Sequence, residues 1–369
     1  MSQSGSPRRR RAAPKPVADV ADLAMYGVTG FTGKLAAHAA QRVGLAMLLA
    51  GRNQESLQRL SREFDDEYPI AVARHDDPDA LAEVARRGRL LVSTAGPFGE
   101  IGSLTVAAAV ATGRHYLDST GEVDFMEQTF RRHDRAAREK ELVVMNACAF
   151  EYVIGDCLTE IALQQNPDAA ELRVSYWLPD KAATRGTAKS ALRILGSDAA
   201  RAVPSRGARI EFPDAVGEKW AVTYAGGELE FLRRRRPGLK VSTLMDMSPL
   251  VARSARALPG IRPLIGLGPV QALLDRAIQR LPEGPGEEQR AAQEWLILVE
   301  VDPGHAPRKG VYGRGVDPYG ITGEILARIA ARVLRGEHRA TGVVSPAQAF
   351  EPEDLLASLS DLGVSWARI

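Results

Sequence analysis

The sequence predicts an α/β protein in which a Rossmann-type, doubly wound parallel sheet precedes a second α+β domain. Three observations support this fold class. Apolar runs of strand length alternate with amphipathic helical segments between about residues 22 and 146, which is typical of repeated βαβ units. A spaced glycine triplet joins the first apolar run to the first helix. Beyond about residue 171, the pattern changes to short alternating runs separated by turns.

The first strand ends at Tyr26, and the stretch YGVTGFTGK carries glycines in the pattern G-x-x-G-x-x-G. In a dinucleotide-binding loop, Gly27 permits the tight turn, Gly30 lets the backbone approach a pyrophosphate, and Gly33 allows the helix to pack closely on the strand. The helix that starts near Thr32 would present its positive end to the phosphates. A glycine turn without a nucleotide is the alternative. The expected cofactor contacts in this loop are Gly27, Thr29, Gly30, Phe31, Thr32 and Gly33.

The residue that follows the second strand favours one cofactor over the other. The run 45–50 ends at Gly51-Arg52-Asn53. An acid there would accept hydrogen bonds from the ribose hydroxyls of NAD, whereas the planar cation of Arg52 can pair with a 2′-phosphate and stack on adenine. We therefore expect NADP(H), with Arg52 and Asn53 near its adenosine. A solvated arginine and a helix-capping Asn53 are the alternatives.

The later elements of this domain follow in order. Apolar runs at 70–72, 90–92 and 142–144 alternate with helical segments near 53–65, 78–87, 102–112 and 123–139. Asp77-Pro78 has the form of a helix cap followed by a first-turn proline, and Gly113 suits a helix end. Asp76 lies where adenine contacts are usual, although Asp76 or Asp77 could simply cap the helix.

The second domain is predicted from short alternating runs at 172–176, 209–212 and 295–299. A final amphipathic helix carries Ile325, Leu326, Ile329, Val333 and Leu334 on one stripe and ends before Gly336. This stripe needs an apolar partner elsewhere in the protein.

These elements predict four segments. Residues 1–18 form a disordered basic arm, 19–150 an NADP-binding Rossmann domain, 151–318 an α+β substrate and dimerisation domain, and 319–369 a C-terminal segment that packs back on the Rossmann domain. The arm carries Arg8, Arg9, Arg10, Arg11 and Lys15 without an acid. It offers nothing to bury. Pro16, Asp19 and Asp22 interrupt any apolar stretch that could make it a signal peptide.

Composition narrows the function classes. The net charge is +2, and the arm's cations leave the remaining body slightly acidic, so we expect no nucleic-acid partner. Two cysteines provide no disulfide framework, and six scattered histidines lack ligand spacing, so no metal site is expected. No apolar run reaches about eighteen residues, which excludes a transmembrane segment. These features favour a cytoplasmic protein.

With the motifs placed, the chain resembles the saccharopine dehydrogenase-like oxidoreductases, and among them the trans-acting enoyl reductase type. The matching stretches are YGVTGFTGK (26–34), LAGRN (49–53), VSTAGPFG (92–99), HYLDSTGE (115–122), RGTAKS (185–190), EGPG (283–286) and DPYGITGE (317–324). This family reduces C=N bonds in some members and C=C bonds in others, so the resemblance implies a reductase without fixing its substrate.

The resemblance also implies particular cofactor contacts. The loop after the fourth strand should bring the backbone of Ala95, Gly96, Pro97 and Phe98 to the nicotinamide ribose, because its glycines and proline make it rigid and poor in side chains. Asp118 follows the fifth strand, at the carboxyl edge where ligands bind in open α/β sheets. An ordinary strand-to-helix turn is the alternative for the loop.

The chain departs from the family after the sixth strand. Relatives usually carry a Gly-Phe-Asp-containing stretch there, whereas this chain has ACAFEY at 147–152. Glu151 and Tyr152 could shape the pocket or donate a proton, with packing or helix capping as the alternative. The expected proton-donor candidates are Tyr152, Glu122 and Lys189.

The leading interpretation is an NADPH-dependent reductase that delivers hydride to an activated C=C bond of an apolar, carrier- or lipid-linked substrate. Imine (C=N) reduction is the first alternative and a non-catalytic NADP-binding regulator the second. A thioester-forming reductase would need a base beside Cys148, and neither His305 nor His338 lies in a recognisable motif. A small buried cysteine is therefore the better interpretation.

The segment 245–279 bears on the substrate and partners. It combines short apolar stripes with more arginines than acids and is broken by Pro259 and Pro263. Such a segment could lie on a membrane, hold a carrier-bound acyl chain, or form core or dimer contacts, so peripheral membrane contact and a homodimer stay open. The run at Arg233–Arg236 is a solvated turn or a site for an acidic carrier.

Overall fold

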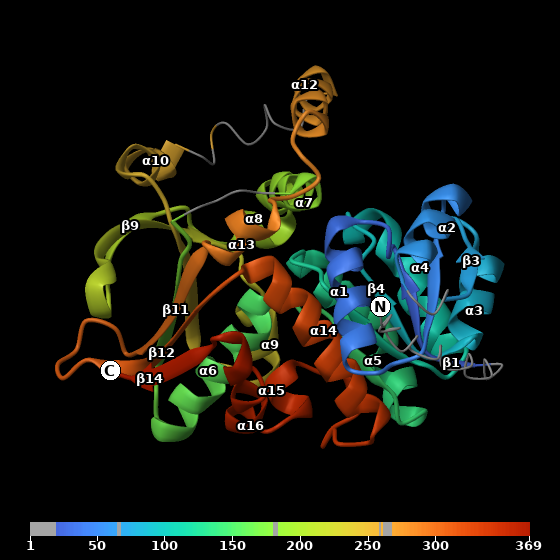
Figure 1. The fold of residues 1–369 in the computed structure, drawn as a ribbon. Coiled ribbons are helices and arrows are strands. Elements are labelled where there is room, and N and C mark those ends of the chain that lie inside the picture. The colour runs from blue at the N-terminus through green and yellow to red at the C-terminus, as the bar shows by residue number, and fades with distance from the viewer. Residues whose placement is uncertain (1–19, 65–67, 180–183, 258–259, 261–267) are drawn as a thin grey trace, which may run out of the picture.

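The computed structural model describes residues 20–64, 68–179, 184–257, 260 and 268–369. Two seven-stranded sheets organise the chain (Figure 1). The basic arm at 1–18, with its arginine run, lies outside the described residues. Pro259 and Pro263 of the segment 245–279 also lie outside them.

The first sheet is wholly parallel and has the strand order β13-β6-β5-β4-β1-β2-β3. Its strands are β1 (Ala21–Tyr26), β2 (Met47–Gly51), β3 (Ile70–Val72), β4 (Gly88–Ser93), β5 (His115–Asp118), β6 (Val143–Met145) and β13 (Gly342–Val343). The chain adds strands on one side of β1 and then returns to its other side with β4. This reversal is the switch point of a doubly wound sheet, and the predicted fold class is confirmed.

Helices cover both faces of this sheet. They are α1 (Phe31–Arg42), α2 (Gln54–Glu63), α3 (Pro78–Arg86), α4 (Phe98–Ala111), α5 (Val123–Glu139), α6 (Phe150–Gln165) and α14 (Pro318–Leu334). One apolar core joins α1, α2, α6 and α14 to one face through residues such as Met25 and Leu49. A second joins α3, α4 and α5 to the other face through Tyr26 and Leu91. Alternate strand residues point to opposite faces, so both cores need apolar side chains.

The second sheet is mixed and has the order β14-β12-β11-β7-β10-β9-β8. Its strands are β7 (Glu171–Trp177), β8 (Gly207–Phe212), β9 (Gly217–Tyr224), β10 (Lys240–Asp246), β11 (Glu294–Val301), β12 (Lys309–Val316) and β14 (Ser365–Arg368). Its further helices are α7 (Arg185–Gly196), α8 (Asp198–Ala202), α9 (Gly227–Arg235), α10 (Pro249–Ser254), α12 (Gly268–Gln279), α13 (Glu287–Ala291), α15 (Pro346–Ala349) and α16 (Pro352–Ala357). Three short 3-10 turns are η1 (Asp214–Val216), η2 (Ala255–Ala257) and η3 (Ser360–Leu362).

The helix α14 returns to the nucleotide domain, as the sequence predicts. It packs along α1, and a Cβ on Gly323 would lie only 3.0 Å from Ala36 N, so glycine permits the close approach of the two helices. Ile329 and Val333 are buried there. The C-terminal segment nevertheless serves both domains: β13 extends the first sheet, whereas β14 pairs with β12 of the second. In Figure 1, α14 lies between the two sheets.

Candidate nucleotide and substrate site

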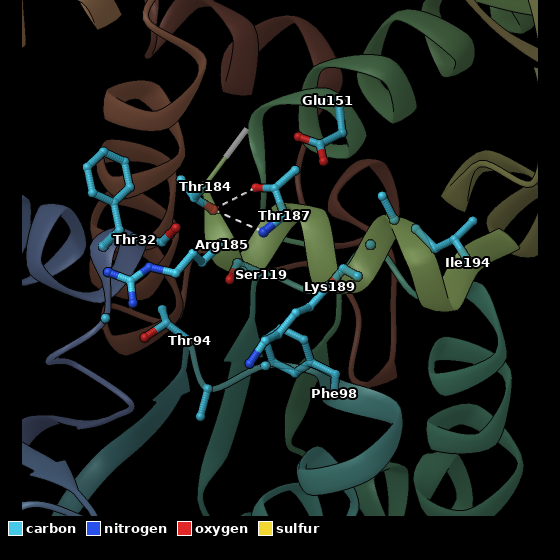
Figure 2. A pocket seen from close by; sticks show the side chains of 18 of the residues that line it. Thr32, Thr94, Phe98, Ser119, Glu151, Thr184, Arg185, Thr187, Lys189 and Ile194 are labelled. Carbon is cyan, nitrogen blue, oxygen red and sulfur yellow. Dashed lines mark hydrogen bonds between the residues drawn. The ribbon is translucent and has the colours of Figure 1, made fainter. Parts of the chain in front are cut away.

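A cavity of about 910 Å³ opens at the carboxyl ends of β1 and β4, between the two domains. The loops after β1, β2, β4 and β5 form one wall, and residues of α6, α7, α8, β9 and β10 form the other. This edge is the topological switch point, where open α/β sheets bind their ligands. Figure 2 shows Thr94 and Phe98 on the first wall and the side chains of α7 across from them.

The glycine-rich loop has the geometry of a phosphate site. Gly27 adopts φ +80°, and a Cβ there would lie 2.6 Å from Ala95 N. A Cβ on Gly33 would lie 2.6 Å from Gly27 O, so this residue packs the helix on the loop and does not line the cavity. The N-terminus of α1 has no side-chain cap and no acid in its first turn. Its free amides and positive end therefore suit a pyrophosphate.

The two helices that follow α1 differ from it, because each has a side-chain cap at its N-terminus. Asn53 Oδ1 accepts a hydrogen bond from Ser56 N at 2.9 Å, and Asp77 Oδ1 accepts one from Ala80 N at 3.0 Å. The side chains of these residues thus satisfy the first turns of α2 and α3. The N-terminus of α1, facing the cavity, is left for a ligand.

The adenosine end of the site contains Gly51, Arg52 and His75. Within the described chain, Arg52 has no hydrogen-bond or ion-pair partner, so its guanidinium is available to a 2′-phosphate. Asn53 does not line the cavity. Asp76 is also absent from the lining: its carboxylate accepts hydrogen bonds from Arg74 at 2.9 and 2.8 Å, and this contact lowers the pKa of Asp76 to about 2.

The loop after β4 brings Thr94, Ala95, Gly96 and Phe98 to the cavity. Thr94 Oγ1 donates to Gly27 O at 3.1 Å and ties this loop to the glycine-rich one. Pro97 follows a cis peptide bond, precedes α4 as its N-cap and does not line the cavity.

Glu122 is a buried helix cap. Phe98 N and Gly99 N each donate to its carboxylate at 2.9 Å, so it satisfies the first turn of α4. Ser190 Oγ donates to the same carboxylate at 3.2 Å, which links α7 to the nucleotide domain. Glu122 does not line the cavity, and its oxygens are occupied as acceptors, so this geometry does not present a proton to a substrate.

Asp118 and Cys148 are both fully buried and absent from the cavity lining. Asp118 accepts hydrogen bonds from Thr120 N, Ala147 N and Asn146 Nδ2 at 3.0, 3.0 and 2.6 Å, and burial raises its pKa to about 6. It organises the turn after β6, where Ala147 adopts φ 60°. Burial, together with Asp118, raises the pKa of the Cys148 thiol, so the thiolate needed for acyl transfer is disfavoured.

The opposite wall contains a cluster of tyrosines and acids. Glu151, Tyr152 and Tyr224 line the cavity, and Tyr176 and Glu228 lie behind them. A Cβ on Gly121 would lie 3.8 Å from Tyr152 Oη, so this hydroxyl reaches the loop after β5. Burial raises the pKa of Glu151 to about 7, and burial together with Glu151 and Glu228 raises the pKa of Tyr152 well above 10. Tyr152 therefore stays neutral and keeps a proton at physiological pH.

Two cations extend into the cavity from consecutive turns of α7. Arg185 Nη2 lies 3.6 Å from Glu283 Oε1, which also lines the cavity. Among the described residues, Lys189 has no hydrogen-bond or ion-pair partner. Figure 2 shows both side chains extending from α7 on the side of Thr94 and Phe98.

One part of the cavity wall formed by the second domain is apolar. Its apolar residues are Ala191, Ile194, Ala200, Val203, Val222, Ala225, Met245, Met247 and Val251, joined by Ile101 of α4. We call these residues the apolar lobe. It lies next to α10, on which Leu250 is 77% exposed. The cavity therefore presents an apolar surface beside α10.

The structure brings together most of the sequence-predicted site. The predicted residues that line the cavity are Gly27, Thr29, Gly30, Phe31, Thr32, Arg52, Ala95, Gly96, Phe98, Tyr152 and Lys189. The predicted residues outside the lining are Gly33, Asn53, Asp76, Pro97, Asp118 and Glu122. Sequence reasoning missed His75, Ser119 and most of the apolar lobe. The stretch RGTAKS was the available signal for α7, since four of its residues besides Lys189 line the cavity.

Two further features of the described residues concern metal binding and membrane contact. Among the described residues, no group of three or more His, Cys, Asp or Glu side chains is arranged to hold a metal ion. No helix in the described ranges combines the length and hydropathy needed to cross a bilayer.

Comparisons with known proteins agree with this geometry. Residues 23–145 match the family described as the saccharopine dehydrogenase NADP-binding domain. A trans-acting enoyl reductase of Mycobacterium leprae is 34% identical over 140 residues, which cover 37% of this chain and 34% of that protein. A lipid droplet localized protein of Caenorhabditis elegans is 27% identical over 146 residues, with the same two coverages. The match thus spans about a third of the length of these relatives.

A solved structure extends the likeness to the second domain. Apo saccharopine dehydrogenase (L-Glu forming) from Saccharomyces cerevisiae superposes with a TM-score of 0.62 and 11% identity, covering 94% of this chain and 99% of that one. At this identity the likeness concerns the fold alone. Residues 23–145 are thus similar to the saccharopine dehydrogenase NADP-binding domain, and the chain shares the fold of the yeast saccharopine dehydrogenase over nearly its whole length.

Proposed function

We propose that this chain is an NADPH-dependent reductase that adds hydride to an activated C=C bond of an apolar, carrier- or lipid-linked acyl compound. One observation carries the proposal: a single cavity joins the uncapped N-terminus of α1 and the unpaired Arg52 to a tyrosine–acid wall and an apolar lobe. The relatives named trans-acting enoyl reductase support the C=C choice.

The nucleotide wall supplies binding and orientation. The amides of Phe31 and Thr32 would hold the pyrophosphate, with Gly30 allowing its close approach, and Arg52 would pair with the 2′-phosphate. The side-chain-poor loop at Ala95 and Gly96 allows a flat ring to approach the end of β4. Bound NADPH supplies the hydride.

The opposite wall supplies the proton and polarises the substrate. Tyr152 keeps a hydroxyl proton because its pKa is raised well above 10, and it reaches the loop after β5. We assign it the protonation of the α-carbon after hydride has reached the β-carbon. Lys189, an unpaired cation in the same cavity, would stabilise the negative charge that develops on the acyl oxygen.

The lining favours an apolar substrate over a small dicarboxylate. The apolar lobe gives an acyl chain a dry surface, and the exposed Leu250 marks an entrance suited to a lipid or to a carrier-bound chain. A saccharopine-like substrate needs fixed cations for several carboxylates. On α7, Arg185 already faces Glu283, which leaves Lys189 as the unpaired cation among the described residues of that helix.

The test offers NADPH with α,β-unsaturated acyl thioesters of increasing chain length and, separately, with an imine formed from an amino acid and an aldehyde. We expect NADPH oxidation with the thioesters and a lower KM for longer chains. Turnover of the imine alone would favour imine reduction instead. NADPH binding without oxidation by either substrate would favour a regulator.

The proton donor is tested by Tyr152→Phe. We expect kcat to fall about 100-fold while NADPH affinity is unchanged, because the hydroxyl acts after cofactor binding. Tyr312→Phe is the matched control: its hydroxyl donates to Asp214 on the second sheet, away from the cavity, and its loss should leave kcat unchanged. Full activity in Tyr152→Phe would remove Tyr152 from the mechanism.

A further inference from the structure

Glu228, which has no part in the mechanism above, lies behind the tyrosine wall with no exposed surface. It stands in the first turn of α9, and one of its oxygens, Oε1, accepts a hydrogen bond from Tyr176 Oη. Its other oxygen, Oε2, has no hydrogen-bond partner in the described part of the chain. A buried carboxylate with an unpaired oxygen is costly, whereas the same carboxyl group carrying a proton is not charged.

Two glycines keep space for this carboxyl group. A Cβ on Gly155 of α6 would lie 2.6 Å from Glu228 Oε1, and a Cβ on Gly226 would lie 2.7 Å from Glu228 Oε2. Any side chain at either position would displace the carboxyl group. The backbone of two separate segments therefore accommodates an acid where an apolar residue would serve packing equally well.

Tyrosines connect Glu228 to the cavity. Tyr176 contacts Glu228 on one side, and its ring lies 6.0 Å from that of Tyr224. Tyr224 lies close enough to Tyr176 on one side and to Tyr152 on the other for these side chains to influence one another's pKa values. Tyr224 and Tyr152 both line the cavity. The order along this series of side chains is Glu228, Tyr176, Tyr224 and Tyr152.

The electrostatic surroundings favour placing a transient charge on Glu228. Burial and the neighbouring acids raise the pKa of Tyr152 and of Tyr224 well above 10, so a tyrosinate at the cavity wall is unfavourable. Burial raises the pKa of Glu228 to about 8, and Asp156 and Glu151 of α6 add to the rise. Asp156 itself pairs with Arg235 of α9. Glu228 is thus protonated at pH 7 yet can lose its proton far more easily than the tyrosines.

We propose that Glu228 is the proton store of the reductase and that Tyr176 and Tyr224 relay its proton to Tyr152 at the cavity wall. This inference rests on the proposed function. The C–H bond of NADPH breaks, its electron pair forms the new bond at the β-carbon, and the π electrons of the C=C bond move to the α-carbon. The O–H bond of Tyr152 then breaks as the α C–H bond forms.

The relay restores Tyr152 in the same event. Tyr152 takes a proton from Tyr224, Tyr224 takes one from Tyr176, and Tyr176 takes one from Glu228, which is left as a carboxylate. The negative charge thereby rests on the least basic group of the chain. When product leaves, solvent that enters the cavity returns one proton to Glu228 along the same tyrosines. NADPH is oxidised, the substrate is reduced, and the protein is unchanged.

The kinetic test compares Glu228→Gln and Tyr176→Phe. Gln keeps an acceptor for Tyr176 but has no proton to release, and Phe removes the link. We expect each variant to lower kcat about tenfold with NADPH affinity unchanged and to abolish the fall of activity above about pH 8. The double variant should be no slower than either single one. The matched control is Glu230→Gln on the same helix, because Glu230 pairs with Arg233 and Arg234 and does not line the cavity.

A measurement of stability separates a loss of activity from a loss of folding. Glu228 has a folded pKa above its unfolded value, so its contribution is complete below about pH 4.5 and is lost as the pH rises toward 8. Glu228→Gln should therefore have a higher urea midpoint than the parent at pH 7 and an equal one at pH 4. An unstable variant at pH 7 would mean that the ionised carboxylate stabilises the fold, and it would contradict a protonated Glu228.

The decisive outcomes differ from those of the proposed function. A parent enzyme that turns over while both variants keep its rate and pH profile would overturn the relay and leave the reductase intact. If none of the offered substrates leads the parent to oxidise NADPH, both the relay and the proposed function would be overturned. Infrared spectra of the unliganded parent and of Glu228→Gln need no substrate: their difference should contain a protonated carboxyl band at pH 6 and pH 7. Its absence at pH 6 would overturn the relay directly.

Discussion

The two walls of the cavity differ in how they are built. The nucleotide wall uses backbone: the uncapped amides of α1, the left-handed Gly27 and the loop at Ala95 and Gly96. The opposite wall uses side chains, with Tyr152 from α6, Tyr224 from β9 and Lys189 from α7. A site built from backbone depends on a few glycines, and these positions tolerate few substitutions. A side-chain site can exchange its chemistry while the fold is kept, so one nucleotide domain can serve different substrates.

The largest effect is expected from a substitution at Gly33 in the nucleotide wall. Its Cβ would lie 2.6 Å from Gly27 O and 2.7 Å from Thr94 Oγ1, so Gly33→Val must push the two cofactor loops apart. We expect NADPH affinity to fall about 100-fold, which corresponds to about 3 kcal/mol, in a fluorescence titration. Gly186→Ala on α7 is the control, because its Cβ would meet Thr184 Oγ1 at an ordinary 3.6 Å. Equal losses in both variants would contradict the difference between the walls.

A smaller effect is expected at the side chain that distinguishes the two cofactors. Because Arg52 lines the cavity without a partner among the described residues, the 2′-phosphate should give NADPH at least about a tenfold advantage over NADH, since one charge-assisted contact contributes about 1.5–3 kcal/mol. Arg52→Asp should remove that preference and leave NADH binding nearly unchanged. Calorimetric titration of both cofactors measures it. Equal affinities for the unmutated protein would reject the role of Arg52.

The same difference explains what could be predicted from sequence. Gly27, Gly30 and Gly33 lie within seven residues, and the steric demands of a turn and a close packing fix their spacing, so a short motif reveals the nucleotide wall. The strands around it follow from apolar runs, because both faces of the parallel sheet are covered. The resemblance supplied the loop after β4 and the return of α14.

The second wall gave no comparable signal. Tyr176 and Glu228 are 52 positions apart, and nothing in the spacing indicates that strand β7 and helix α9 bring them into contact. Glu122 shows the opposite error. Its position after β5 suggested an acid facing a ligand, but whether a carboxylate caps a helix or faces a substrate depends on the register of α4, which the sequence does not fix. The Asp118 carboxylate likewise does not face the cavity, because three hydrogen-bond donors in the loops after β5 and β6 hold it in the interior.

The pH dependence of kcat tests the role of Glu151 in the second wall. Burial raises the pKa of its carboxyl to about 7, so it is neutral below pH 7 and ionised above it. A charge there opposes the negative charge that builds up on the substrate, and kcat should fall several-fold as pH rises through 7. Glu151→Gln should lose this limb. Glu139→Gln, at an exposed acid on α5, is the control and should keep it. A profile unchanged in Glu151→Gln would place Glu151 outside the reacting region.

The smallest effect is expected at Cys148, which belongs to neither wall. Its thiol is fully buried, donates to Met145 O at 3.7 Å and does not line the cavity. Burial and Asp118 raise its pKa, so it remains a thiol at neutral pH and cannot serve as the nucleophile of an acyl-transferring reductase. Cys148→Ala should keep most of the turnover while losing about 1 kcal/mol of stability, measured by urea unfolding. Intact-mass spectrometry of the parent during turnover should reveal no acyl-enzyme. A trapped thioester on Cys148 would require the acid and tyrosine wall to be reassigned to a supporting role.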